Sequence, residues 1–386
     1  MREGVLFEIT RDNLDTGMRG FPVGYCSTSH VDPQKGLFYS GRPVSELAFR
    51  DPVEIIYLLY YGEMGTSEQV SKFSQDLRQR SHCNPEMIRH IQALPKVGRP
   101  MDLFASAILI AGMFELNGDY KEDCLNLIAK IPEITAHVIN HHAGWEKAPL
   151  SKPELGYMEN FVHMLSIPGE KKPEMTNVFR MMHILSLDHG GGNLSTFVGK
   201  AVASGLENMY GSIAAAMTAL AGSRHGGANQ ETLAFVQAVL KEVGPNATQV
   251  DVENVLRRRI ENKEVIMGFG HAVLRVEDPR STICYQYCQK HFSEDPLVKT
   301  ARLLRMGGAK VLKENSKISD PHPNIDAITG VMLSAAGFPF PDYFTVLFGL
   351  ARSVGISIQI MDERVYAREG KGTPIVRPSY LYRHRV

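Results

Sequence analysis

Apolar residues recur at intervals of three and four along most of the chain, the spacing that places them on one face of an α-helix. A short extended segment is indicated only around Tyr39 and Ser40, after the turn-like Asp32-Pro33-Gln34-Lys35-Gly36. We therefore expect an all-α fold with one small hairpin near its start. The pattern predicts amphipathic helices at residues 53–61, 66–80, 103–114, 123–140, 158–165, 175–186 and 196–203.

Prolines and small residues refine these predictions. Pro132 lies inside the segment 123–140 and predicts a break in that helix. Residues 209–222 and 343–361 are mostly small or apolar, which is typical of helices packed on all sides. The second of these contains Arg352, so a buried helix explains it better than a membrane span.

The length of the chain, 386 residues, favours two domains. Residues 231–256 and 296–315 carry mixed charge, as surface helices of a smaller and more solvated domain do. We expect a large helical domain formed by residues 1–228 and 330–386. A small domain at residues 229–329 would be inserted into it.

Charge and cysteine content exclude several classes of protein. Lys plus Arg and Asp plus Glu both number 42, so no overall field favours nucleic acid or an anionic membrane. Five scattered cysteines do not form a disulfide framework, and none is at zinc-finger spacing, so we expect a reducing compartment and no metal site. The first residues include acids and no apolar run of signal-peptide length, which predicts a cytoplasmic location, with a mature organellar form as the alternative.

Four polar clusters interrupt the helices at glycines. Glycine lets the backbone approach a ligand closely, while neighbouring His, Asn and Arg side chains offer contacts to it. Each cluster taken singly also fits a capped helix end or a solvated turn. The clusters are DHGGGN at 188–193, RHGGANQ at 224–230, GFGHAVLRVEDPR at 268–280 and NIDA at 324–327.

The residue types in these clusters suit the removal of a proton from carbon. Apolar neighbours would raise the basicity of Asp326. The enolate formed from a thioester needs charge stabilisation, which His225 and His271 can supply by hydrogen bonding. Arg275 and Arg280 follow His271, and arginine is well suited to a bidentate grip on carboxylate or phosphate.

In this order and at these separations, the four clusters resemble those of the citrate synthase family, and the resemblance covers most of the chain. LFYSGRPVSEL at 37–47 and VLFGLARSVG at 346–355 are similar to the family's first turn and helix and to its late core helix. The match is closest to the mitochondrial-type branch. The resemblance implies an all-helical, two-domain homodimer that needs no metal or redox cofactor and takes acetyl-CoA as substrate. It also implies that the large domain carries the dimer interface and that the small domain closes over substrate from the CoA side.

The resemblance also implies a role for each site residue. Asp326 would remove an α proton from acetyl-CoA, His225 would stabilise the enol, and His271 would act on the oxaloacetate carbonyl. The residues that would hold oxaloacetate are His189, Asn193, Arg280, Arg352 and, reaching the partner subunit's site, Arg377. The residues that would meet CoA are Arg275, Arg42 and Arg224, with the backbone from Met267 through Gly268 to Gly270.

Three departures from the family pattern bear on the substrate. Gly190 stands where relatives commonly have Glu, Ser223-Arg224 replaces Pro-Leu, and Ser40 replaces a CoA-binding Arg, with Arg42 close by. Citrate synthase is the first hypothesis. A 2-methylcitrate synthase using propionyl-CoA stays open, because one methylene changes binding by only about 1–3 kcal/mol. A non-catalytic family member that acts as a binding or interaction protein is the third reading.

Overall fold

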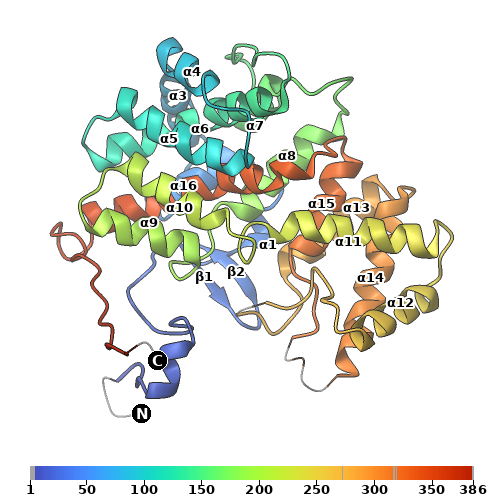
Figure 1. Cartoon of the computed structure of the whole chain (residues 1–386). Helices are drawn as coiled ribbons and strands as arrows, with labels where there is room; N and C mark the ends of the chain where they lie inside the picture. The colour runs from blue at the N-terminus through green and yellow to red at the C-terminus, as the bar shows by residue number, and fades with distance from the viewer. Residues whose placement is uncertain (1–4, 272, 316–317, 319, 385–386) are drawn as a thin grey trace.

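The computed structural model of the chain describes residues 5–271, 273–315, 318 and 320–384. Helices dominate this part of the chain (Figure 1), which confirms the expected all-α fold. The helices are η1 (Arg11–Asp15), α1 (Val44–Leu47), α2 (Pro52–Tyr61), α3 (Ser67–Arg80), α4 (Pro85–Gln92), α5 (Pro100–Glu115), α6 (Tyr120–Ala143), α7 (Tyr157–Met164), α8 (Glu174–Ser186), α9 (Leu194–Ser204), α10 (Met209–Leu220), α11 (Ala228–Val243), α12 (Gln249–Glu261), α13 (Pro279–His291), α14 (Pro296–Lys313), α15 (Asp326–Ala335), η2 (Pro341–Tyr343) and α16 (Phe344–Val365).

A three-stranded antiparallel sheet lies where the hairpin is predicted, and its strands are β1 (Ser29–Asp32), β2 (Gly36–Tyr39) and β3 (Arg42–Pro43). The carboxylate of Asp32 accepts hydrogen bonds from the backbone N–H groups of Gln34 and Lys35, which closes the turn between β1 and β2. A Cβ atom at Gly36, whose φ is +97°, would collide with the ring of Pro279. This close approach fixes the sheet against the start of α13.

The predicted break at Pro132 is wrong, because α6 continues through this residue. A proline inside a helix leaves the carbonyl four residues earlier without its usual N–H donor. Here the hydroxyl of Tyr157 donates a hydrogen bond of 2.6 Å to that carbonyl, on Ile128. A side chain from α7 thus supplies the missing donor, and the helix continues.

The mixed-charge segment 231–256 forms two helices, α11 and α12. α11 ends at Gly244, whose φ of +79° is a conformation that glycine adopts readily, and Pro245 follows it. The side chain of Thr248 then accepts a hydrogen bond from the N–H of Asp251 and caps α12.

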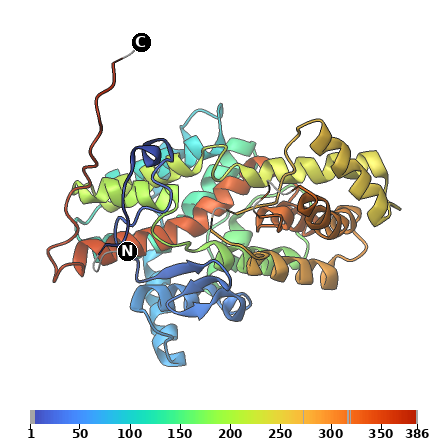
Figure 2. The ribbon, with the colours of Figure 1, turned by 90° about the horizontal axis from the view of Figure 1, so that it is seen from below.

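Helix α16 lies at the centre of the fold and packs against α6, α8, α9 and α10 (Figures 1 and 2). Gly355 allows it to approach closely, since a Cβ atom there would meet the carbonyl oxygen of Leu187 at the end of α8. By length and composition this helix could cross a membrane, but 94% of its most apolar window is buried inside the protein. The core helix of a soluble protein is buried in the same way. The burial agrees with the buried helix predicted at 343–361.

Helices α11 to α15 pack against one another on one side of the molecule (Figure 1). This group holds most of the residues that we assign to a small domain from the sequence. The expected boundary between residues 329 and 330 falls within α15, which runs without interruption from Asp326 to Ala335. The division into two domains stays a prediction.

Candidate active site

Three of the predicted site residues meet between the end of α8, the loop before α13 and the first turn of α13. The rings of His189 and His271 lie 5.5 Å apart between their centroids. Nη2 of Arg280 lies 3.4 Å from Nε2 of His189. Segments about 80 to 90 residues apart along the chain therefore contribute to one polar centre.

Backbone pairing ties the loop of His271 to the start of α15, where Asp326 lies. The N–H of Gly270 donates to the carbonyl of His322, and the N–H of Asn324 donates to the carbonyl of Gly268, both at 2.9 Å. Gly268 has a φ of +82°, and a Cβ atom there would lie 2.8 Å from Cα of Ala327. Only glycine allows this approach, so the predicted backbone site at Gly268 also brings two of the predicted catalytic segments together.

Asp326 is the first residue of α15, and the side-chain oxygen of Asn324 accepts a hydrogen bond of 2.9 Å from its N–H. Burial raises the pKa of the Asp326 carboxyl from 3.8 to about 6, while the cation of Arg280 opposes this rise. At neutral pH the group is mostly ionised, yet it is a stronger base than an exposed aspartate. The predicted proton acceptor thus has an environment that suits the task.

The hydrogen bonds of His271 define its tautomer. Its Nδ1 accepts hydrogen bonds from the backbone N–H groups of Val273 at 3.0 Å and Leu274 at 2.9 Å. Burial and the cation of Arg280 lower the pKa of this imidazole, so the ring is neutral at neutral pH. A neutral ring that accepts at Nδ1 carries its proton on Nε2, which is then a hydrogen-bond donor.

His225 is held by the start of α9. Its Nε2 lies 2.9 Å from the hydroxyl oxygen of Ser195 and 3.3 Å from the N–H of the same residue. Burial, assisted by the cation of Arg352, lowers the pKa of His225 to about 4. The ring is therefore neutral, and because Ser195 occupies Nε2, Nδ1 is the nitrogen left for a ligand.

Asn193 is the N-cap of α9, because its side-chain oxygen accepts hydrogen bonds from the hydroxyl of Ser195 and the N–H of Thr196. Its amide nitrogen donates to the carbonyl of Gly190 at 3.1 Å. The capping reading of this cluster is therefore confirmed for Asn193. The same residue supports Ser195, which contacts His225.

Two arginines are buried beside the histidines. Arg280 is 4% exposed and forms an ion pair with Asp278, which is 1% exposed. Nε and Nη2 of Arg280 donate hydrogen bonds to the carboxylate of Asp278. Arg352 is 2% exposed, donates from Nε to the carbonyl of Ser186 at 3.1 Å, and lies over the ring of Phe348. Burial lowers the pKa of Arg352 to about 10, so it remains a cation at neutral pH. Such buried cations suit carboxylate ligands.

A family model described as citrate synthase, C-terminal domain, matches residues 17–379 of this chain. The chain belongs to the citrate synthase family. Mitochondrial citrate synthase 4 of Arabidopsis thaliana is 35% identical over 384 residues, which cover 93% of this chain and 80% of the relative. Mitochondrial citrate synthase of Citrus maxima is 34% identical over 397 residues, with 97% and 83% covered.

Solved structures agree with this assignment. Citrate synthase of Thermotoga maritima superposes with a TM-score of 0.80 at 27% identity, covering 96% of this chain and 95% of that one. The enzyme of Thermoplasma acidophilum, solved as a ternary complex with carboxymethyl coenzyme A and oxaloacetate, superposes with a TM-score of 0.82 at 25% identity, and 96% of each chain is covered. The family, the fold and the citrate synthase character predicted from the sequence are thus confirmed.

The polar centre of this citrate synthase family member is supported by Asp188, for which no role is predicted from the sequence. Asp188 is fully buried and accepts hydrogen bonds from the hydroxyl of Thr28, the amide of Gln359 and the N–H of His189. Its position directly before His189 was the available signal. Of its partners, Thr28 lies directly before β1 and Gln359 lies on α16. Both are far from Asp188 along the chain, so the sequence does not reveal these contacts.

The arginines predicted to contact CoA or the partner subunit's site lie at the surface. Arg42, Arg224, Arg275 and Arg377 are all exposed. Arg275 is the one whose contacts reach the site, because its guanidinium donates to the carbonyl of His271 at 3.2 Å. Arg377 lies in the extended segment after α16, which leads away from the body of the molecule (Figure 2).

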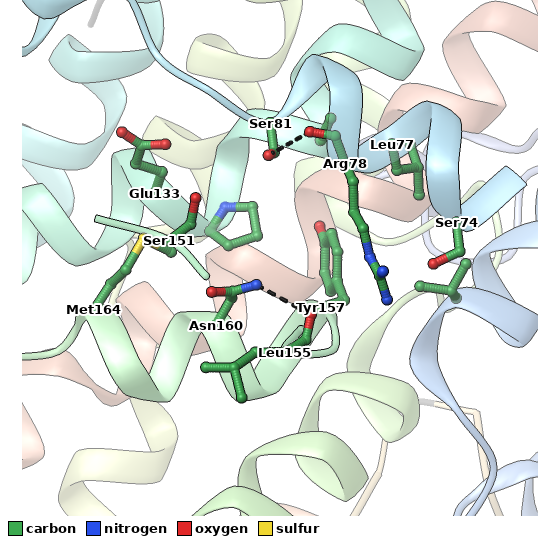
Figure 3. Close-up of a pocket in the computed structure, with 13 residues that line it drawn as sticks. Ser74, Leu77, Arg78, Ser81, Glu133, Ser151, Leu155, Tyr157, Asn160 and Met164 are labelled. Atoms are coloured by element: carbon green, nitrogen blue, oxygen red, sulfur yellow. Dashed lines mark hydrogen bonds between the residues drawn. The ribbon is translucent and has the colours of Figure 1, made fainter. Parts of the chain in front are cut away.

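A cavity lies away from this centre, between α3, α6 and α7 (Figure 3), and its volume is about 470 Å³ including its opening. Its walls are mainly apolar, with Arg78, Glu133 and Asn160 among its polar groups. It contains none of the predicted site residues.

Proposed function

We propose that the protein condenses acetyl-CoA with oxaloacetate and hydrolyses the resulting citryl-CoA to citrate and CoA. The observation that carries this proposal is the grouping of a carboxylate of raised pKa, two neutral histidines and two buried arginines in one member of the citrate synthase family. The relative from Thermoplasma acidophilum, which binds oxaloacetate and a CoA analogue, supports the choice of substrates.

In this proposal the carboxylate of Asp326 removes a proton from the methyl group of acetyl-CoA. A hydrogen bond from His225 stabilises the negative charge that develops on the thioester oxygen. Nε2–H of His271 donates to the ketone oxygen of oxaloacetate, the enol carbon attacks the ketone carbon, and the alkoxide that forms takes the Nε2 proton of His271. Water then cleaves the thioester and releases CoA as a free thiol.

The buried cations position the second substrate. His189, Arg280 and Arg352 hold the carboxylates of oxaloacetate, with Asn193 supporting the site from the α9 cap. This assignment fits the charge of the ligand, because oxaloacetate carries two carboxylates and arginine binds such groups in a bidentate manner. The transfers use protons held by side chains, so the reaction needs no metal or redox cofactor.

The arginines assigned to the CoA side are exposed. Arg42, Arg224 and Arg275 meet phosphate groups of CoA, and the backbone at Gly268 and Gly270 lines the pocket of the adenine ring. Arg377 completes the site of a partner subunit, so the active form is a homodimer. Its exposure on a segment that leaves the body supports this assignment (Figure 2). Sedimentation of the protein with and without residues 373–386 tests the dimer.

A thiol-release assay tests the reaction. Acetyl-CoA and propionyl-CoA are each combined with oxaloacetate, 2-oxoglutarate and pyruvate, and kcat/KM is compared. The proposal predicts the highest value for acetyl-CoA with oxaloacetate. A higher value for propionyl-CoA would assign a 2-methylcitrate synthase, while no thiol release in any combination, with oxaloacetate binding retained in calorimetry, would leave a binding protein.

A cytoplasmic location is part of the proposal. Several relatives are named mitochondrial citrate synthases, so a mature organellar enzyme is the competing assignment. Fractionation of the source cells with an antibody against the protein distinguishes the two compartments.

A further inference from the structure

His183 is a buried histidine whose polar atoms are not satisfied by the described protein groups. The residue lies on α8 and is 3% exposed. Neither Nδ1 nor Nε2 has a hydrogen-bond partner among the described residues. The ring packs against Tyr157, with 5.4 Å between the centroids, but the Tyr157 hydroxyl is already bonded to Ile128. Buried polar atoms of this kind nearly always have a hydrogen-bond partner, so we expect one for the ring of His183.

A cavity lies beside this ring, with a volume of about 300 Å³ including its opening. Its walls are mostly apolar, and the polar side chains among them belong to His183 and Ser186. Burial lowers the pKa of His183 to about 3, so the ring is neutral and has one N–H donor and one acceptor. Water is small enough for such a cavity and can serve both kinds of atom.

The same cavity is bordered by the residues that contact Arg352. Ser186 lines the cavity, and its carbonyl accepts the hydrogen bond from Nε of Arg352. Phe348 also lines it, and the guanidinium of Arg352 lies 4.7 Å from the centroid of this ring. Both groups that hold Arg352 therefore border the space that His183 faces.

We infer that His183 binds a buried water molecule that bridges it to the hydroxyl of Ser186, and that His183 thereby positions Arg352 for the carboxylate substrate. His183 does not touch substrate in this arrangement and is a positioning residue. The role in substrate binding rests on the proposed function, whereas the water site does not.

Three variants separate positioning from simple packing. His183→Leu removes both polar atoms, His183→Gln keeps a donor and an acceptor, and Met182→Leu alters an apolar wall of the same cavity. We expect His183→Leu to raise the KM for oxaloacetate by about 5- to 10-fold, in line with loss of one supporting hydrogen bond, with kcat nearly unchanged. His183→Gln should restore most of the wild-type KM, and Met182→Leu should leave it unchanged.

A crystal structure that resolves ordered water provides the readout that does not depend on activity. Density for a water between His183 and Ser186, lost in His183→Leu, supports the inference, even if the wild-type protein releases no thiol and the proposed function fails. A dry cavity in the wild-type crystal would overturn the water site. An equal rise of KM in all three variants, or an unchanged KM in His183→Leu, would overturn the positioning role.

Discussion

The backbone N–H of Leu274 donates a hydrogen bond of 2.9 Å to Nδ1 of His271. Together with the N–H of Val273, it places the imidazole proton on Nε2. A turn of the main chain thus sets the tautomer of a predicted catalytic histidine. This arrangement keeps the ring neutral and leaves one donor for a substrate oxygen.

Replacement of His271 tests this donor. His271→Gln offers an amide donor but cannot deliver a proton, so we expect kcat to fall by about 10²- to 10⁴-fold. The distant His163→Gln, on α7, serves as the matched control and should retain activity. Steady-state kinetics with saturating substrates measure both. Near-normal kcat in His271→Gln would remove this residue from the proton-transfer steps.

The pKa of Asp326 predicts the acid limb of the pH profile. The carboxyl acts as a base only when ionised, and its pKa is about 6. We therefore expect kcat/KM for acetyl-CoA to be level above about pH 7 and to fall about tenfold per pH unit below 6. His225, with a pKa of about 4, stays neutral over this range. A profile that remains level down to pH 5 would contradict the assignment of the base.

In its ionised form, the same carboxyl should lower the free energy of unfolding of the protein. Its pKa is higher in the folded state, about 6, than its ordinary value of 3.8. Its contribution to stability is therefore complete below pH 3.8 and is lost as pH rises through 6. Asp326→Asn removes this cost, and we expect a gain of up to about 3 kcal/mol at pH 8 and about half of it at pH 5.

Chemical unfolding at the two pH values measures this gain, with the exposed Asp342→Asn as the control. Equal stability of Asp326→Asn and the wild type at pH 8 would show that burial does not penalise the charged carboxylate. A gain accompanied by loss of turnover is expected of an active-site residue that is kept for function.

The ion pair of Arg280 and Asp278 links substrate binding to stability. Arg280→Ala should raise the KM for oxaloacetate steeply, and it also leaves the buried Asp278 without its cation, which costs about 3–5 kcal/mol. The double variant Arg280→Gln with Asp278→Asn should recover most of the stability but not the KM. Urea unfolding and kinetics separate the two effects. Recovery of KM in the double variant would contradict the assignment of Arg280 to the substrate.

Much of the fold follows from local patterns in the sequence. The three-and-four spacing of apolar residues predicts most of the long helices, because burial of one helix face is a local property of the chain. The break expected at Pro132 fails because the hydroxyl that compensates for it belongs to Tyr157, 25 residues further on. Helix propensity is a local property of the chain and carries no information on such a distant donor.

The residues of the candidate site can be predicted from the sequence, but the residues that hold them in place cannot. His189, His271 and Arg280 lie in glycine-rich clusters that mark them in the sequence, and the structure brings them together. The burial of Asp188 depends on contacts from Thr28 and Gln359, which lie about 160 to 171 residues away. Such supports become visible only when the chain is folded.

The formation of citrate by the wild-type protein and by Asp326→Ala tests the central claim most directly. Both proteins are incubated with acetyl-CoA and oxaloacetate, and citrate is quantified by chromatography. We expect citrate in an amount equal to the CoA released by the wild type, and a rate lower by several orders of magnitude for Asp326→Ala, with oxaloacetate binding retained. Absence of citrate with the wild type, or equal rates for the two proteins, would contradict the account.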